Sequence, residues 1–437
     1  MNRALSIGRC QTGAKNWWRV VAHPVTKNTM SLYALQLANI TLPLLLIPYL
    51  ARVLLPKSLG IYLFFYSLSI WLYTVIEYGF NLFATREISR ERDNKGRVAE
   101  IVAGVLGSQG LVTVAVIFLA VVTFYLVPFL RQNPVFLALS LLFGIAKGFG
   151  PLWYFQGKEK MQIVAALEVA GRTCATFLTF PLVRSPNHGW VALALPGLTS
   201  LIVTLVQMYL MYREIEFRFP RRINAIFALK GGWNMFVYRF SASLYTTANV
   251  IILGVISSPA TVSFFGGAEK ITRGLLTLIS PISNALYPRI SYLVAHEPAK
   301  AWRIIRLTLL AFAIGGVFLG MFIASGAPIW ISMLLGPGYD AAIPFLRILS
   351  LLAPLLPIST AISVLCMLPM DLEKRLNVII FSAGVLNVIS AILLARMWDG
   401  LGMAIVAVTT EAFVTFNVCL VLRNVKTVLY NRAHGIS

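Results

Sequence analysis

Long apolar runs limit what this chain can fold into more than any other feature of its sequence. Twelve runs have the length of roughly 20 residues with which a helix crosses the hydrocarbon core of a bilayer. They cover residues 30–50, 61–84, 101–130, 135–155, 162–183, 190–212, 233–256, 261–286, 304–324, 341–367, 376–395 and 401–422. Charged residues make up only 12% of the chain, about half of their share in soluble proteins. We therefore expect an all-α polytopic membrane protein with about twelve transmembrane helices.

Lysine and arginine are distributed unevenly between the segments that join these runs. If the N-terminus is cytoplasmic, the segments on that side hold 25 basic residues and the loops on the other side hold 5. Cytoplasmic segments of membrane proteins carry an excess of this kind. The count predicts that both termini are cytoplasmic. It also accounts for the net charge of +21 without nucleic acid as a partner.

A long basic segment after the sixth run divides the chain in the middle, with six runs on either side. We expect a cytoplasmic tail (1–29), an N-lobe (30–212), a cytoplasmic linker (213–232), a C-lobe (233–422) and a second cytoplasmic tail (423–437). In transporters built from two such halves, the substrate site lies between them.

Several ionisable residues lie inside the apolar runs, where each charge costs about 2.5–3.5 kcal/mol on insertion scales. Such residues usually face a protein interior or a water-filled cavity. The basic ones are Lys147, Arg172, Arg239, Lys270, Arg273, Arg306 and Arg347, and the acidic ones are Glu77, Glu168, Glu269 and Glu411. The surplus of positive charge predicts a cavity that accepts an anion.

Two acidic residues have a basic residue one helical turn later in the favourable orientation for an ion pair: Glu168 precedes Arg172, and Glu269 precedes Arg273. These pairs either neutralise themselves or serve a ligand. Four basic residues lack an acid at helical spacing in their own runs: Lys147, Arg239, Lys270 and Arg347. Glu77 or Glu411 could reach some of them from another helix, but a basic surplus remains. We expect the four to line one central cavity.

Uncharged polar residues also occur inside the runs, with Gln36 and Asn39 in the first and Asn249 in the seventh. They either bind sugar hydroxyl groups or form hydrogen bonds between helices.

The sequence contains no Walker A, HExxH or GxSxG motif, and its four cysteines lack metal-binding spacing. We expect no cofactor, no metal and no enzymatic activity. Glu77, Glu168 and Glu411 are candidates for ion coupling, because a buried carboxyl group can exchange a proton near neutral pH.

Four stretches resemble the Wzx-type polysaccharide flippases, in the polysaccharide transport branch of the superfamily that also contains the MATE transporters. They are "PYLARVLLPKSLGIYLFFYSL", "EYGFNLFATREIS", "WYFQGKEKM" and "SFFGGAEKITRGLLTLISPISNALYPRIS". The resemblance extends over about residues 32–423, so the first 29 residues lie outside it.

The resemblance implies two six-helix lobes around a central cavity, in the bacterial inner membrane. It implies that the chain moves an undecaprenyl-pyrophosphate-linked oligosaccharide repeat unit from the cytoplasmic to the periplasmic leaflet for surface polysaccharide synthesis. A polysaccharide polymerase and a chain-length regulator would be its protein partners. Lys147, Arg239, Lys270 and Arg347 would then bind the pyrophosphate, since lysine and arginine are the side chains that recognise it.

Two other functions remain as alternatives. A MATE-like antiporter of drugs or cations would need buried acid, and the first run contains none. A membrane polysaccharide polymerase or ligase would need a long external loop, and no predicted outside loop exceeds about 17 residues.

Overall fold

The computed structural model describes the backbone of residues 24–277 and 279–433, and side chains from Thr41 to Arg423 apart from a few positions in 44–284. Over this range the chain is almost entirely helical and contains no strand. The all-α fold expected from the apolar runs is therefore confirmed.

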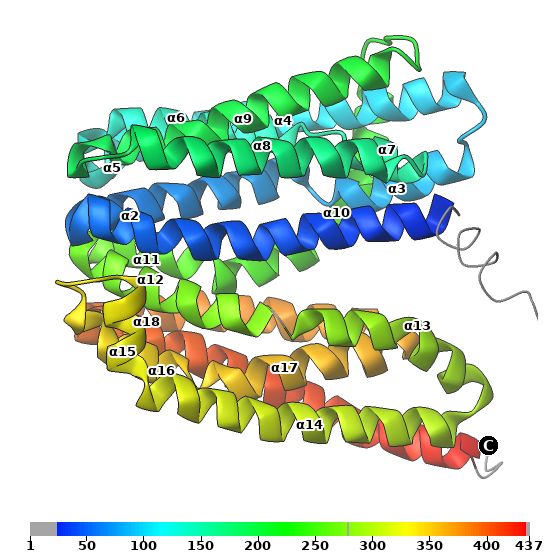
Figure 1. Cartoon of the computed structure of the whole chain (residues 1–437). Helices are drawn as coiled ribbons and strands as arrows, with labels where there is room; N and C mark the ends of the chain where they lie inside the picture. The colour runs from blue at the N-terminus through cyan, green and yellow to red at the C-terminus, as the bar shows by residue number, and fades with distance from the viewer. Residues whose placement is uncertain (1–23, 278, 434–437) are drawn as a thin grey trace, which may run out of the picture.

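Eight helical segments in the described range are long and apolar enough to cross a membrane, or nine if one bent pair counts as a single span. Two of these segments belong to the helices α2 (Pro24–Glu77) and α18 (Glu373–Ala433), which turn back on themselves (Figure 1). The turns lie at Leu55 and at Trp398–Asp399, where the backbone angles are not helical. The expected count of twelve spans stays a prediction.

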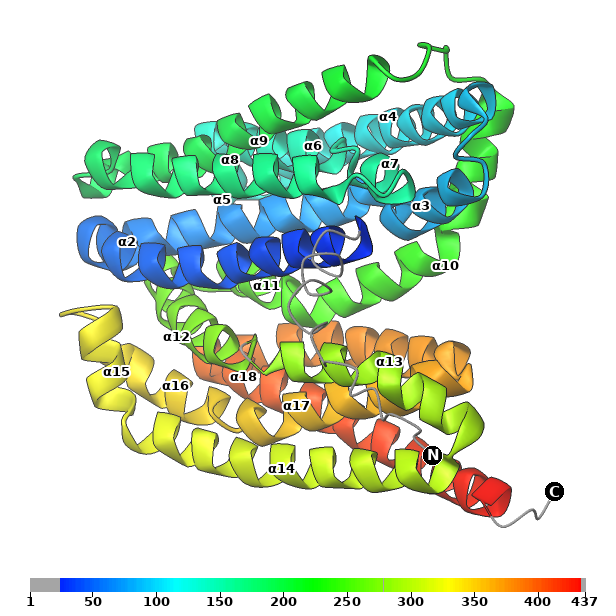
Figure 2. The ribbon, with the colours of Figure 1, turned by 45° about the vertical axis from the view of Figure 1, so that its right-hand side comes forward.

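The helices form two bundles, which separate clearly in Figures 1 and 2. The N-lobe contains α2, α3 (Phe80–Arg90), α4 (Lys95–Leu126), α5 (Pro128–Gln132), α6 (Pro134–Gly148), α7 (Leu152–Gly157), α8 (Met161–Leu182) and α9 (Gly189–Tyr212). The C-lobe contains α10 (Arg222–Thr246), α11 (Ala248–Ile256), α12 (Pro259–Thr277), α13 (Ser280–His296), α14 (Pro298–Ser325), α15 (Ala327–Leu334), α16 (Ile343–Leu349), α17 (Leu352–Ile362) and α18. A π-helical turn, η3 (Ser363–Met367), follows α17.

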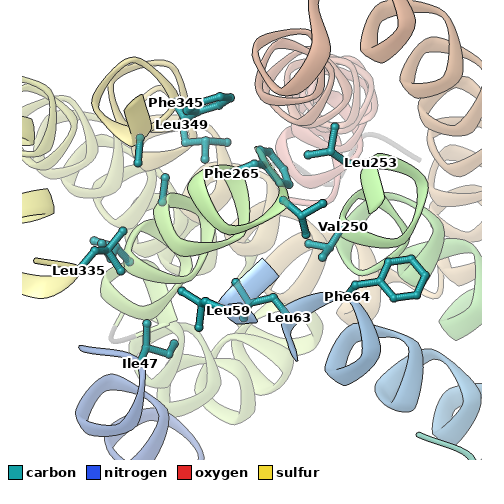
Figure 3. Close-up of a cluster of buried hydrophobic side chains, with 14 of the residues drawn as sticks. Ile47, Leu59, Leu63, Phe64, Val250, Leu253, Phe265, Leu335, Phe345 and Leu349 are labelled. Atoms are coloured by element: carbon teal, nitrogen blue, oxygen red, sulfur yellow. The ribbon is translucent and has the colours of Figure 1, made fainter. Parts of the chain in front are cut away.

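The lobes meet at one end of the molecule, which we call the closed end, and diverge toward the other (Figure 2). Figure 3 shows the apolar cluster at this end, where Leu63 and Phe64 of α2 lie among Val250, Leu253 and Phe265 of the C-lobe. All five side chains are buried. Buried apolar side chains of this kind pack at the density of a protein interior, so the cluster joins the two lobes closely at this end.

Polar contacts reinforce the closed end. The Tyr339 hydroxyl donates a hydrogen bond of 3.0 Å to the carbonyl of Ala51, and Arg52 donates one of 2.6 Å to the carbonyl of Met333. Both satisfy carbonyl groups where helices end or turn. The first helical hairpin of the N-lobe is thus fixed to the C-lobe.

α10 is the helix that crosses between the lobes. It begins at Arg222, within the segment 213–232 that the sequence predicts to be a linker. Its first half packs on the N-lobe, where Ser108 donates a hydrogen bond of 2.8 Å to the carbonyl of Ala225 and Ala228 joins the apolar core. Its second half packs against the C-lobe core through Tyr238 and Tyr245. α10 and α11 then meet at a bend of 48°.

The loop before α10 is anchored to the N-lobe. Glu214 accepts hydrogen bonds from Lys160 at 2.5 Å and from Tyr154 at 3.0 Å, and Arg218 pairs with Glu100 at 2.9 Å. Partial burial of Glu214 opposes its ionisation, but the hydrogen bonds from Lys160 and Tyr154 outweigh it and lower the pKa of this carboxyl group. The start of α10 is therefore tied to the N-lobe on its polar side as well.

Gly60 provides a test of the closed end. A Cβ atom at this position would lie 1.6 Å from the carbonyl oxygen of Pro259 in α12, so Gly60→Ala must separate the lobes there. Overpacking of this kind costs about 1–3 kcal/mol, which shifts the ratio of closed to open ends by roughly fivefold to a hundredfold. A cysteine placed at Thr247, beside the interlobe space, should react correspondingly faster with an impermeant thiol reagent added on the closed side.

Gly110→Ala is the matched control, since nothing lies within 4 Å of a Cβ atom at that position. It should leave the labelling rate unchanged. Equal labelling in the two alanine variants would contradict the packing described for the closed end.

Candidate functional site

Three adjoining cavities extend across the middle of the molecule. The N-lobe cavity, of about 140 Å³, lies between α2, α6, α8 and α9. The interlobe cavity, of about 450 Å³, lies between α2 and the helices α10, α11 and α12. The C-lobe cavity, of about 250 Å³, lies between α10, α12, α17 and α18. Lys270 lines the first two, and Arg273 lines the last two.

The N-lobe cavity contains an ion pair and an additional cation. Lys147 of α6 pairs with Glu168 of α8, and both side chains are mostly buried. Gln207 donates a hydrogen bond of 3.4 Å to the same carboxylate. Arg172, one turn further along α8, also lines the cavity and is half-buried. Among the described residues it has no acidic partner within salt-bridge distance.

α12 supplies the charges of the interlobe cavity. Glu269 and Arg273 lie one turn apart and form a salt bridge of 2.9 Å. Lys270 follows Glu269 by about 100° around the helix, so its side chain leaves in another direction. Its Nζ atom lies 5.1 Å from the ring centre of Tyr66 in the N-lobe, a cation–π contact. No carboxylate pairs with Lys270 in the part of the chain that the structure describes.

The C-lobe cavity contains a carboxyl group. Glu411 of α18 is only 6% exposed and accepts a hydrogen bond of 2.5 Å from the Ser359 hydroxyl of α17. Tyr238 and Tyr245 of α10 face the same space, and Arg273 forms its boundary with the interlobe cavity.

Across the three cavities, the lining residues carry more positive than negative charge. The basic residues are Lys147, Arg172, Lys270 and Arg273, and the acidic residues are Glu168, Glu269 and Glu411. Two of the basic residues, Arg172 and Lys270, lack an acidic partner among the described side chains. Lys270 is one of the four residues for which the sequence predicted this role, whereas Arg172 is not.

The structure pairs several charges otherwise than the sequence suggests. Glu168 pairs with Lys147 from another helix rather than with Arg172. Arg239 pairs with Glu77 of α2 at 2.5 Å, and Glu77 also accepts the backbone N–H of Asn81 at 2.8 Å. The sequence allowed Glu77 to reach one of the four basic residues from another helix, and it does so at Arg239, whereas the partner of Lys147 is Glu168.

Other predicted site residues lie away from the cavities. Arg347 is exposed on the short helix α16 and lines none of the three. Asn249 is fully buried in α11, where its amide donates to the carbonyl of Tyr245 at 3.2 Å. The expected single cavity lined by Lys147, Arg239, Lys270 and Arg347 is thus not what the structure contains. The side chains of Gln36 and Asn39 lie outside the described residues.

Sequence reasoning missed the hydroxyl groups of the N-lobe cavity. Thr176 and Thr179 follow Arg172 along α8 at steps of four and three residues, and all three line the cavity. Steps of this size place side chains on one face of a helix. The polar stripe could therefore have been found from the sequence, whereas the cation–π partner Tyr66 has no such signal.

Two helical lobes with polar cavities between and within them define a transporter fold. The chain aligns with an inward-facing multidrug resistance MATE family transporter of the MOP superfamily at a TM-score of 0.64, with 15% identity over 90% of this chain and 96% of that one. It aligns with lipid II flippase MurJ in an inward closed conformation at a TM-score of 0.66, with 12% identity over 91% of this chain and 87% of that one.

Sequence comparison identifies the family. Residues 25–294 match the family described as polysaccharide biosynthesis protein. A protein of Escherichia coli (strain K12) named as an O-antigen transporter is 32% identical over 409 residues, which are 92% of this chain and 97% of the relative. A protein of Shigella dysenteriae with the same name is 27% identical over 397 residues, 89% of this chain and 97% of the relative. The chain therefore belongs to the polysaccharide biosynthesis protein family, and the resemblance noted in its sequence is confirmed.

The salt bridge between Lys147 and Glu168 predicts how two substitutions affect the stability of the protein. Lys147→Met leaves the buried Glu168 carboxylate without its cation, which costs about 3–5 kcal/mol for a buried pair. Arg172→Met removes a cation that pairs with no described carboxylate, so its effect on folding should be small. Thermal unfolding of the purified variants in detergent measures the difference.

The double variant Lys147→Met with Glu168→Gln should recover most of the lost stability, because it removes both charges of the pair. If Arg172→Met proves as destabilising as Lys147→Met, the pairing described here is contradicted.

Proposed function

We propose that this protein is a flippase that moves undecaprenyl-pyrophosphate-linked oligosaccharide repeat units from the cytoplasmic to the periplasmic leaflet of the inner membrane. The observation that carries the proposal is that Arg172 and Lys270, both lining the N-lobe cavity of a transporter fold, have no acidic partner among the described residues. The names of the relatives, which refer to O-antigen transport, support the same substrate class.

The chemistry of the cavities fits a phosphorylated glycan. Arg172 provides a planar guanidinium group and Lys270 a compact ammonium group, and both types donate charge-assisted hydrogen bonds to phosphate oxygens. Thr176, Thr199 and Ser200 line the N-lobe cavity beside them and can form hydrogen bonds with sugar hydroxyl groups. A cationic drug would instead meet uncompensated positive charge, which disfavours the antiporter alternative.

The proposed direction of transport follows from the orientation in the membrane that the distribution of lysine and arginine predicts. With the termini in the cytoplasm, the closed end at Leu55 faces the periplasm, and the lobes diverge toward the cytoplasm. A chain in this conformation can receive its substrate from the cytoplasmic leaflet. Rearrangement of the lobes would then expose the cavities on the other side, where a polymerase and a chain-length regulator would act on the repeat unit.

A reconstituted flipping assay tests the proposal. Liposomes are prepared with the lipid-linked repeat unit and the purified protein, and an impermeant reagent that oxidises the glycan measures the fraction in the outer leaflet over time. Removal of one group that bonds a charged ligand costs about 1.5–3 kcal/mol. Lys270→Ala and Arg172→Ala should therefore reduce the apparent affinity roughly tenfold to a hundredfold.

Arg347→Ala is the matched control, since it removes one positive charge from an exposed position outside the cavities. It should flip at the wild-type rate. Wild-type rates for both cavity variants at normal protein levels would refute the cationic site.

The orientation of the chain in the membrane can be tested with a reporter enzyme that is active only in the periplasm. Fusions after Arg184 should be active, whereas fusions after Arg218 or at the C-terminus should be silent. Activity at the C-terminus would mean that this end lies outside and that the proposed direction of transport has lost its basis.

A further inference from the structure

Glu411 differs from the other buried carboxyl groups of the membrane region. The other three are paired in salt bridges: Glu77 with Arg239, Glu168 with Lys147, and Glu269 with Arg273. Glu411 is as deeply buried, yet among the described residues only the Ser359 hydroxyl bonds its carboxyl group. An ionised carboxylate buried without a cation is strongly unfavourable, so this environment stabilises the neutral, protonated form.

Arg273 is the cation that faces Glu411. It lines the C-lobe cavity together with Glu411 and the interlobe cavity together with Glu269. Its Nε atom is bonded to Glu269, and the guanidinium group has further N–H donors to offer. The guanidinium group of Arg273 and the carboxyl group of Glu411 therefore border the same C-lobe cavity. Tyr238 and Tyr245 are the other titratable groups that line it.

We propose that Glu411 is a proton-binding site that controls the anion site through Arg273. In the first state Glu411 carries a proton, and Arg273 is held by Glu269 as the structure shows. When Glu411 loses that proton to water in the C-lobe cavity, the O–H electron pair stays on the carboxylate and no other group changes its protonation. The new charge draws the Arg273 guanidinium group from Glu269 toward Glu411.

This movement of Arg273 changes the net charge of the interlobe cavity. That an anion binds in this cavity rests on the proposed function. With Arg273 on Glu269, the interlobe cavity has two cations and one carboxylate, a surplus of one positive charge. With Arg273 turned to Glu411, only Lys270 and Glu269 remain and the cavity is neutral. Proton binding at Glu411 and anion binding between the lobes therefore favour each other, as linkage requires.

The protonation state is tested first, without any substrate. The infrared spectrum of the wild type minus that of Glu411→Gln, both reconstituted in liposomes at about pH 7, should contain the carbonyl stretch of a protonated carboxyl group. Carboxylate stretches in its place would overturn the proposal. This result does not depend on transport, so it separates a failure of the proton site from a failure of the proposed flippase function.

The linkage is tested with geranyl pyrophosphate as a soluble probe of the anion site. Glu411→Gln keeps residue 411 neutral at every pH, so Arg273 stays on Glu269. The variant should therefore bind the probe as the wild type does at about pH 6, and roughly tenfold more tightly than the wild type at about pH 9. The probe's own ionisation is the same for both proteins. Equal affinities of the two proteins at both pH values would overturn the link through Arg273.

Two further variants establish whether Glu411 itself is the group that titrates. Glu214→Gln, in the loop before α10, removes a carboxylate outside the cavities and should follow the wild type at each pH. Ser359→Ala removes the hydroxyl that donates to Glu411, so the ionised form loses support and the midpoint of the pH dependence should rise. A midpoint that is unchanged in Ser359→Ala would mean that another group titrates.

Discussion

The cost of burying charge away from water determines how the interior of this protein is arranged. Each salt bridge inside the bundles joins helices or adjacent turns that must stay in register: Lys147 with Glu168, Arg239 with Glu77, and Arg273 with Glu269. Breaking a buried pair is costly because it strands the remaining charge. Pairing therefore fixes the helices that surround the cavities. In the part of the chain that the structure describes, Arg172, Lys270 and Glu411 are the ionisable groups lining the cavities that no salt bridge pairs.

The two ends of the molecule are held by different interactions. Apolar side chains such as Phe64 and Phe265 close one end, and packing of that kind can separate without leaving a buried charge. Toward the other end α10 crosses from one lobe to the other. Its start is tied to the N-lobe by Glu214, Arg218 and Ser108, whereas its end packs on the C-lobe. The two attachments meet within α10, between Ala228 and Tyr238.

The sequence alone predicted the features that depend on a local pattern of residues. Apolar runs predicted the helical membrane fold, and the spacing of Glu269 and Arg273 predicted a pair that the structure contains. It was not sufficient for contacts between helices. Glu168 has Arg172 at ideal helical spacing, yet Lys147 approaches it from α6. Arg347 has apolar neighbours along the chain, but the short helix α16 presents it on the surface. Such outcomes depend on how helices pack, which periodicity does not encode.

The positions of the unpaired cations suggest why an anion and lobe movement belong together. Arg172 lies in the N-lobe and Lys270 in the C-lobe, and both line the same cavity. Two like charges that are shielded from bulk water repel each other by a few kcal/mol at short distance, so the empty protein resists bringing these helices closer. A pyrophosphate between them replaces repulsion with two attractions. In the proposed function, the bound ligand thus removes an energetic barrier to rearrangement of the lobes. The empty protein retains this barrier, which disfavours movement of the lobes without substrate.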